Sequence, residues 1–244
     1  MSEGWARKNE AERVANGPRW EAGAVLASKI RTVHFVRHAQ ATHNLAAKEE
    51  GRIAYMDPTH HDARLTEGGM KQCDGRLREH AKSVAGEVDL VLVSPCTRAT
   101  DTALRGFGGD VSESVKWYAL ECLREKSGQH PCDGRRAVSQ LKAEFPKINY
   151  SLMEDDEDVY GEKTLGEERE TDEMVAARAR QFLAFLDGRP ERNVVVVTHS
   201  AFLCVLFNRV VTCGSDLRRW YENCEMRTTH FTITENEGEG EDRN

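Results

Sequence analysis

Apolar residues in this chain gather in short continuous runs. Residues 30–36, 89–93 and 193–198 each contain several adjacent valine, isoleucine, leucine or phenylalanine side chains. Runs of this length are short for a helix and are typical of parallel strands that are buried on both faces. We therefore predict three central strands in these segments, with a weaker strand over residues 114–120 and a last edge strand over residues 227–233.

Patterns typical of helices lie between the predicted strands. Residues 65–84 are expected to form a helix with Thr66 as its N-cap, because a threonine hydroxyl at that position accepts a hydrogen bond from the free N–H groups of the first turn. Further helices are expected from Pro95 onward and over residues 135–145, 167–186 and 201–211. Strands that alternate with helices predict an α/β fold, which we expect to be a three-layer sandwich with helices flanking a mostly parallel central sheet.

The remaining segments are predominantly polar. Residues 1–29 are interpreted as a peripheral N-terminal extension, and residues 45–64 as a loop that crosses the surface. The acidic run over residues 154–158 is expected to be a solvated loop, and residues 235–244 an acidic, disordered tail. These interpretations leave one globular domain over residues 30–234.

Composition limits the class of protein. Of the 244 residues, 39% are hydrophobic and 31% are charged, which is typical of a globular protein. The net charge of −7 disfavours nucleic acid and anionic membranes as partners, and no apolar run has the length of a membrane span. The seven cysteines contain no CxxC pair and their number is odd, which favours reduced thiols and a cytosolic or nuclear location.

Candidate chemistry follows the predicted strands at the points where they end. Arg37 and His38 come directly after the first strand, Arg98 lies near the start of the helix after the second, and His199 follows the third. Alone, each would usually be a solvated arginine or a hydrogen-bonded structural histidine. Because the carboxyl ends of parallel strands meet at one edge of a sheet, we expect all four to lie close together. Arginine suits phosphate and histidine can be a nucleophile at neutral pH, so the pattern favours a phosphate site.

The segments that carry these residues also support a family resemblance. They read RHAQATHN, LTEGG, SPCTRATDTA, LRE and VTHS, in that order, over about residues 30–205. In this they resemble the histidine phosphatase superfamily, the phosphoglycerate mutase-like proteins, and the segment ECLREKSGQHPCDGRR is similar to a plant and fungal branch. The resemblance implies a phosphoglycerate mutase-like fold in which His38 accepts the phosphoryl group. It also implies that Arg37, Arg98 and His199 form the phosphate pocket, and that a glutamate after Leu120 donates a proton.

The chemistry of a phosphomonoester is consistent with these roles. Two guanidinium groups can neutralise the phosphate dianion, so that neutral His38 can attack phosphorus in line and form a phosphohistidine. His199 can donate to the phosphoryl oxygens when the bound anion holds it protonated. Asn44, and Thr42 or Ser200, could add neutral donors.

Two glutamates compete for the role of proton donor. Glu121 and Glu125 are four residues apart and would share one face of a helix. Glu125 fits the family's Leu-x-Glu pattern with Gly128 nearby, so we prefer it and keep Glu121 as the second choice, with a surface or supporting role as its simpler interpretation. His130 could line the substrate side of the pocket, although we prefer to interpret it as an ordinary loop histidine.

No metal or cofactor is expected, because arginines can supply the positive charge and the adjacent residues His60, His61 and Asp62 lack metal-ligand spacing. We therefore expect a metal-independent phosphatase, a phosphoric monoester hydrolase, that acts on a small phosphorylated substrate. A phosphoglycerate mutase is the first alternative, although Ala39 and Gln40 stand where mutases usually have Gly and Glu. A non-catalytic phospho-ligand-binding protein is the second. The substrate and the oligomeric state are left open.

Overall fold

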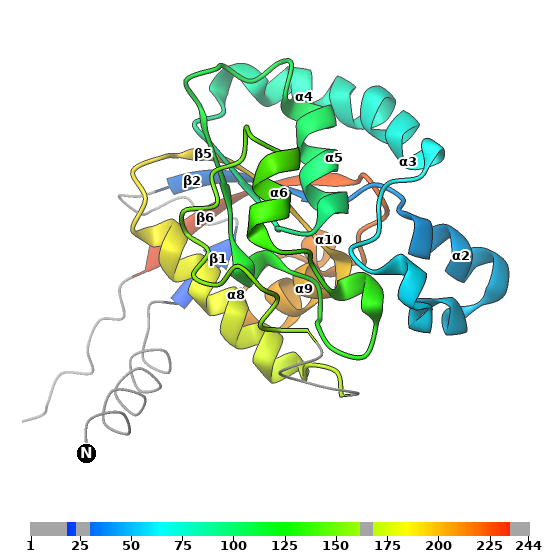
Figure 1. The fold of residues 1–244 in the computed structure, drawn as a ribbon. Coiled ribbons are helices and arrows are strands. Elements are labelled where there is room, and N and C mark those ends of the chain that lie inside the picture. The colour runs from blue at the N-terminus through cyan, green and yellow to red at the C-terminus, as the bar shows by residue number, and fades with distance from the viewer. Residues whose placement is uncertain (1–18, 23–29, 162–167, 235–244) are drawn as a thin grey trace, which may run out of the picture.

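The computed structural model describes residues 19–22, 30–161 and 168–234 (Figure 1). Its centre is a six-stranded sheet in the order β1-β6-β2-β5-β3-β4. The strands are β1 (Arg19–Ala22), β2 (Ile30–Arg37), β3 (Leu90–Val93), β4 (Lys116–Ala119), β5 (Asn193–Thr198) and β6 (Met226–Thr234). Strands β2, β5, β3 and β4 are parallel, whereas β6 runs antiparallel to β2 and β1 antiparallel to β6. The three central strands and the mostly parallel sheet are confirmed.

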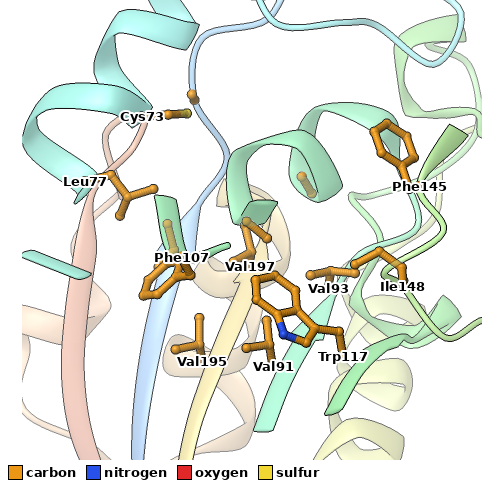
Figure 2. Close-up of a cluster of buried hydrophobic side chains, with 14 of the residues drawn as sticks. Cys73, Leu77, Val91, Val93, Phe107, Trp117, Phe145, Ile148, Val195 and Val197 are labelled. Carbon is orange, nitrogen blue, oxygen red and sulfur yellow. The ribbon is translucent and has the colours of Figure 1, made fainter. Parts of the chain in front are cut away.

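Successive side chains of these strands enter two cores, one on each face of the sheet, because side chains alternate along a strand. Val91 and Val93 of β3 share one core with Val195 and Val197 of β5, and Phe107 packs in the same core, as Figure 2 shows. Leu90, Leu92, Val194 and Val196, the alternate residues of the same strands, are buried in the other core.

Helices cover both cores. The first core is packed by α3 (Glu67–Gln72), α4 (Arg78–Val84), α5 (Thr97–Phe107) and α6 (Val138–Glu144), and the second by α8 (Asp172–Asp187) and α9 (Ser200–Val205). The short helix α10 (Ser215–Arg218) follows α9 (Figure 1). The expected three-layer α/β fold is therefore confirmed. Among the described helices, none is both long and apolar enough to cross a membrane.

The predicted helix over residues 65–84 is continuous, because a π-helical turn over Cys73–Leu77 joins α3 to α4. As predicted, Thr66 is its N-cap, and the Thr66 hydroxyl accepts a hydrogen bond from the N–H of Gly69 at 2.9 Å. A Cβ atom on Gly69 would lie 2.0 Å from the carbonyl oxygen of Gln40, so glycine is needed here. This contact sets the start of α3 directly against the loop that follows β2.

The prediction of an irregular loop over residues 45–64 was wrong. Helix α2 spans Thr42–Glu50, and 3-10 helices follow over Arg52–Met56 and Pro58–His60. Only one residue of α2 is buried, so no apolar stripe marks it in the sequence. Its start is stabilised instead by the side chain of Asn44, whose Oδ1 accepts a hydrogen bond from the N–H of Ala41 at 3.0 Å.

Two predictions at the margin of the sheet also need correction. The segment over residues 227–233 is strand β6, but it is not an edge strand, because β1 pairs with its outer side. Residues 19–22 were assigned to a peripheral extension, yet they form the edge strand β1, so the sheet reaches further toward the N-terminus than residue 30. Four residues are too few to show a strand pattern. The rest of the extension and the expected acidic tail, residues 235–244, lie outside the described residues.

The acidic run over residues 154–158 has no regular secondary structure, as expected, but it is not simply solvated. The carboxylate of Asp158 accepts a hydrogen bond from Arg124 Nη2 at 2.9 Å. Backbone carbonyls of the run accept hydrogen bonds from the fully buried guanidinium of Arg135. Two buried arginines therefore fix this segment against the body of the protein.

Candidate active site

His38 leaves the C-terminal end of β2 and is 2% exposed. Its Nδ1 lies 2.8 Å from the carbonyl oxygen of Ala39, which can only accept a hydrogen bond. The ring proton is therefore assigned to Nδ1, which leaves the lone pair on Nε2. Burial, with the charges of Arg98 and Arg37, lowers the pKa of His38 well below its ordinary value. At neutral pH His38 is consequently an uncharged imidazole whose Nε2 carries a lone pair.

The backbone around His38 is held from two sides. Its N–H donates to the carbonyl oxygen of Thr198 at 2.9 Å, which continues the pairing of β2 with β5. Its carbonyl oxygen accepts hydrogen bonds from Asn223 Nδ2 at 3.0 Å and from the N–H of Cys224 at 3.2 Å. The position of the imidazole is thus set by the sheet and by the segment before β6.

Arg98 is the second residue of α5 and is fully buried. Its Nε donates to His38 Nε2 at 3.3 Å, and its Nη2 donates to Asp133 Oδ1 at 3.2 Å. Its Nη1 donates to the carbonyl oxygen of Cys132. Each nitrogen of the guanidinium therefore has a partner, so the cation is fixed beside the imidazole. The helix begins at Thr97, two residues later than the Pro95 start that the sequence predicted.

The N-terminus of α5 is capped by a distant residue. The N-cap position, Cys96, provides no side-chain hydrogen bond. Instead the buried carboxylate of Asp62 accepts hydrogen bonds from the N–H of Thr97 at 2.8 Å and from its hydroxyl. The same carboxylate accepts from Arg136 Nε at 2.9 Å. Asp62 thus fixes the turn of helix that carries Arg98.

Arg37 is the second predicted cation of the site. Its Nη1 donates to the carbonyl oxygen of Tyr221 at 2.7 Å. Its Nε is buried and has no hydrogen-bond partner within the described part of the chain. Burial lowers the pKa of Arg37, and the nearby Glu125 opposes that shift. Arg37 lines the cavity, so its guanidinium group can contact an anion there.

His199 lies behind His38, with the two ring centroids 5.0 Å apart. Its Nε2 is 2.7 Å from the hydroxyl oxygen of Ser94, and its buried Nδ1 has no partner among the residues that the structure describes. Burial, followed by the charge of Arg98, lowers the pKa of His199 well below its ordinary value. The ring is therefore neutral when no anion is bound. It is fully buried and does not line the cavity.

Glu125 lies where α9 begins and is 8% exposed. Its Oε1 accepts hydrogen bonds from the N–H groups of Lys126 at 2.9 Å and Phe202 at 3.2 Å. Its Oε2 accepts from the N–H of Ala201 at 3.3 Å and lies 3.5 Å from the Ser200 hydroxyl. These four contacts hold the carboxyl group at the wall of the cavity.

Glu121 has a different environment. Its carboxylate accepts hydrogen bonds from Arg124 Nη1 at 2.8 Å and from Arg135 Nε at 3.0 Å. It does not line the cavity, whereas Glu125 does. Of the two glutamates that the sequence left as alternatives, Glu121 belongs to an ion-pair network and Glu125 lies at the wall of the cavity.

The cavity has a volume of about 210 Å³. Six of the residues proposed from the sequence line it, namely Arg37, His38, Asn44, Arg98, Glu125 and Ser200. Sequence reasoning missed several others, namely His43, Arg52, Tyr55, Asp133, Arg169 and Trp220. His130, interpreted as an ordinary loop residue, also lines the cavity, and its ring stacks on Tyr55 with centroids 5.3 Å apart.

One of the missed residues stands inside a recognised motif. His43 is buried, and its ring centroid is 5.9 Å from that of His38. Burial lowers the pKa of His43 to about 2, with Arg98 adding to the shift. Its Nε2 is 2.9 Å from the Nδ2 of Asn44, which must be the donor because a neutral ring can accept there. His43 therefore orients Asn44 while staying uncharged.

The lining of the cavity includes additional cations and aromatic rings. Arg169 Nη2 donates to Asp133 Oδ2 at 3.0 Å, so one buried carboxylate joins Arg169 to Arg98. Arg52 is exposed at the rim, and Trp220 is 52% exposed. Arg169 and Trp220 come from irregular segments, where no periodic pattern marks a residue as part of a site.

Across the described ranges, no group of three or more His, Cys, Asp or Glu side chains is arranged to hold a metal ion. His60, which the sequence set aside as a metal ligand, has its Nδ1 at 3.2 Å from the hydroxyl oxygen of Thr42. That contact packs the 3-10 turn around His60 against α2.

Comparison with known proteins identifies the class to which this fold and site belong. The sequence model of the histidine phosphatase superfamily (branch 1) matches residues 33–243. The chain belongs to this superfamily. It is 35% identical, over 232 residues, to a phosphoglycerate mutase-like protein of Arabidopsis thaliana, with 82% of this chain and 84% of the relative covered. The resemblance seen in the sequence is thus confirmed.

Solved structures with the same fold include proteins with both kinds of name. The ecdysone phosphate phosphatase of Bombix mori, solved in complex with tungstate, matches with a TM-score of 0.54 and 14% identity, covering 81% of this chain and 88% of that one. A phosphoglycerate mutase from Bacillus anthracis matches with a TM-score of 0.53 and 17% identity, covering 85% and 93%. At these identities the likeness establishes the shared fold.

Proposed function

We propose that this protein is a metal-independent phosphoric monoester hydrolase that works through a phosphohistidine at His38. The observation that carries the proposal is the state of that imidazole. It is buried and neutral, its Nδ1 proton is fixed on the Ala39 carbonyl, and its Nε2 lone pair accepts a hydrogen bond from Arg98. His38 lines the cavity together with Arg37 and Arg98. Membership of a superfamily whose name is histidine phosphatase supports it.

In the first step, the phosphate dianion of the substrate is held by the guanidinium groups of Arg37 and Arg98. The Nε2 of His38 attacks phosphorus, a nitrogen–phosphorus bond forms and the bond from phosphorus to the ester oxygen breaks. The departing oxygen takes a proton from the carboxylic acid of Glu125, so that the product leaves as an alcohol. His38 then carries the phosphoryl group, and Glu125 is a carboxylate.

In the second step, Glu125 acts as a base. Water attacks the phosphorus of the phosphohistidine while the Glu125 carboxylate removes its proton. The nitrogen–phosphorus bond breaks, which returns His38 to its neutral form and releases inorganic phosphate. Glu125 is again a carboxylic acid, so the cycle closes without any added group.

His199, Asn44 and Ser200 assist through hydrogen bonds in this proposal. Asn44 and Ser200 line the cavity and can donate to phosphoryl oxygens. His199 does not line the cavity, but its ring centroid is 5.0 Å from that of His38 and its Nδ1 has no partner in the described part of the chain. In this proposal a bound dianion favours the protonated form of His199, and Nδ1 donates to a phosphoryl oxygen. The cavity volume of about 210 Å³ suits a small phosphorylated molecule as substrate. All seven cysteines are free thiols, which supports our proposal of a reducing cytosolic or nuclear location.

A mutase is the second candidate function, and one observation favours it. Arg52 and Arg169 add two guanidinium groups to the cavity beyond the two assigned to the phosphate. A mutase needs extra cations to bind a second anionic group of its substrate. Arg169 is already offset by Asp133, which weakens that argument. Product analysis with phosphoglycerates separates the two, because a mutase interconverts isomers faster than it releases phosphate.

The test of the proposed function is the hydrolysis of 4-nitrophenyl phosphate in the presence of EDTA, with wild type compared with His38→Ala. We expect activity that survives the chelator and is lost in the variant. Rapid quenching should also trap a phosphoprotein that is stable in alkali and labile in acid, as a phosphohistidine is. Near-normal hydrolysis by the variant would overturn the mechanism. A wild type that binds phosphate but turns nothing over would favour the non-catalytic ligand-binding alternative.

A further inference from the structure

A buried ion pair lies next to the segment that carries Glu125, outside the cavity. Arg178 of α8 and Glu170, which precedes that helix, have side chains that are 4% and 1% exposed. The Nε of Arg178 donates to Glu170 Oε1 at 2.8 Å, and its Nη2 donates to Oε2 at 2.6 Å. Neither residue lines the cavity. Burying two charges costs free energy that their attraction recovers only with good geometry and further hydrogen bonds.

Those further hydrogen bonds all go to one short stretch of backbone. Arg178 Nη1 donates to the carbonyl oxygens of Cys122 at 2.9 Å and Arg124 at 3.1 Å. Its Nη2 donates to the carbonyl oxygen of Glu125 at 3.1 Å. A guanidinium has five N–H donors, and here all five are used. The cation is therefore fully committed to Glu170 and to the backbone around Glu125.

Glu170 holds the other end of the same stretch. Its Oε2 accepts a hydrogen bond from the N–H of Ser127 at 2.7 Å, and its own N–H donates to the carbonyl oxygen of Ser127 at 2.9 Å. The ion pair is thus hydrogen-bonded to the backbone on both sides of Glu125. No other charged pair in the described ranges is hydrogen-bonded to the carbonyl of Glu125.

The side chain of Glu125 depends on where this backbone lies. Its carboxyl group accepts hydrogen bonds from the N–H groups of Ala201 and Phe202, at distances of 3.3 and 3.2 Å. These bonds are long, so a small shift of the Glu125 backbone would break them. Arg178 also packs against the second element of this arrangement, with its guanidinium carbon 6.0 Å from the ring centroid of Phe202.

We propose that Arg178, with Glu170, is a positioning residue for the proton donor: the pair holds the backbone of residues 122–127 so that the Glu125 carboxyl group reaches the departing oxygen. This inference rests on the proposed function, in which Glu125 protonates that oxygen. Displacement of a catalytic group by about 1 Å can cost on the order of a hundredfold in rate. Loss of the hydrogen bonds from Arg178 and Glu170 to this backbone should therefore impair proton donation more than phosphate binding.

The effect can be read from how strongly the rate depends on the leaving group. A 4-nitrophenolate ion leaves readily without a proton, whereas phenolate, whose conjugate acid has a pKa of about 10, needs one far more. We would measure kcat/KM for 4-nitrophenyl phosphate and phenyl phosphate and take their ratio. The constant kcat/KM covers formation of the phosphohistidine, the step in which the acid acts.

Arg178→Met should raise the ratio of the two kcat/KM values about tenfold over wild type, with most of the loss on phenyl phosphate. Glu125→Gln is the reference for complete loss of the acid and should raise the ratio about 100-fold or more. Glu170→Gln, a milder change that leaves an oxygen for the Ser127 N–H, should raise it in the same direction and covers the case in which Arg178→Met does not fold.

The matched control is Leu186→Ala, about two turns further along α8. Leu186 is fully buried in the second core, so its truncation loosens the same helix without touching residues 122–127 by a hydrogen bond. A purely structural effect lowers both rates equally and leaves the ratio unchanged.

Two results would overturn the inference, and only the second would also overturn the proposed function. If Glu125→Gln raises the ratio while Arg178→Met and Glu170→Gln behave like Leu186→Ala, the positioning role is wrong and the proposed function stands. If Glu125→Gln itself leaves the ratio unchanged, Glu125 is not the proton donor, and both the proposed function as written and the positioning role fail.

Discussion

The Nε of Arg98 lies 3.3 Å from the Nε2 of His38 and donates a hydrogen bond to it. The cation thus faces the lone pair that we propose as the nucleophile. Burial and, after it, the charge of Arg98 lower the pKa of His38 and keep the imidazole unprotonated. In the proposed mechanism, a phosphate oxygen that enters the cavity competes with His38 for this N–H, so substrate binding would release the nucleophile.

This geometry predicts that Arg98→Lys is not a conservative change. A lysine keeps the charge, but one ammonium group cannot contact His38, the Cys132 carbonyl and Asp133 together in the way that the planar guanidinium does. We expect kcat/KM to fall by about 10²–10³ and the inhibition constant for inorganic phosphate to rise. Steady-state kinetics with phosphate as inhibitor measure both. Arg105→Lys, at the half-exposed end of the same helix, is the control and should keep its activity. Unchanged phosphate affinity in Arg98→Lys would contradict the role.

Substitutions of Glu125 and Glu121 should differ in their effect on kcat. Glu125→Gln cannot donate or remove a proton, so kcat should fall by about 10²–10⁴. Because an amide has one accepting oxygen where Glu125 uses two, the free energy of unfolding should also fall by about 1–3 kcal/mol. Glu121→Gln weakens hydrogen bonds to Arg124 and Arg135, so it should lower the free energy of unfolding by about 1–3 kcal/mol and leave kcat nearly intact. Parallel kinetics and urea denaturation test this prediction. The reverse pattern would assign the proton transfer to Glu121.

The central strands and the four strand-end residues could be predicted because continuous apolar runs are visible in a sequence. Parallel strands in one sheet necessarily bring Arg37, His38, Arg98 and His199 to one edge. The Thr66 cap was equally visible, since capping depends on residues a few positions apart. In each case the signal is local, and the topology of the sheet supplies the rest.

The parts that escaped prediction depend on contacts between distant segments. Asp62 caps α5 from 35 residues away, and Arg178 binds backbone carbonyls 53 to 56 residues away. Backbone carbonyls carry no side-chain identity, so no pattern of residue types records such a contact. The polar helix α2 and strand β1 were also missed, because neither has a run of apolar residues long enough to show a helix or strand period in the sequence.

The buried histidines predict how stability depends on pH. His38, His43 and His199 have pKa values held below the ordinary value by burial, to about 2 for His43. In the unfolded chain they titrate near pH 6.5, so below that pH the unfolded state binds protons that the folded state does not. Stability is therefore full above about pH 6.5 and falls as pH falls. For His43 the loss between pH 7 and pH 5 is about 2 kcal/mol.

The substitution His43→Gln measures the contribution of one histidine to this pH dependence. In His43→Gln, the decrease in the free energy of unfolding between pH 7 and pH 5 should be about 2 kcal/mol smaller than in wild type. Urea denaturation at the two pH values gives this difference, and it is independent of any constant loss that the substitution causes. Equal decreases in wild type and variant would show that His43 is not buried as a neutral ring.

Asp62 offers the last prediction, on the link between helix capping and the proposed phosphate site. Its carboxylate caps α5 and pairs with Arg136, and its φ of 45° lies in the left-handed region that asparagine tolerates well. Asp62→Asn therefore removes the charge without straining the backbone. One Asp62 oxygen accepts from the Thr97 N–H, and the other accepts from the Thr97 hydroxyl and Arg136. Because asparagine has only one oxygen, one of these two sets of hydrogen bonds is lost, and the free energy of unfolding should fall by about 1–3 kcal/mol.

The same change should weaken phosphate binding, since the capped turn carries Arg98. Asp57→Asn is the matched control: this exposed carboxylate caps a short 3-10 turn through the N–H of Thr59 at 2.8 Å, a contact that asparagine makes equally well. It should change neither stability nor the inhibition constant for phosphate. If Asp62→Asn loses stability but binds phosphate as wild type does, the cap supports the fold alone, and Arg98 is held by Cys132, Asp133 and His38 without it.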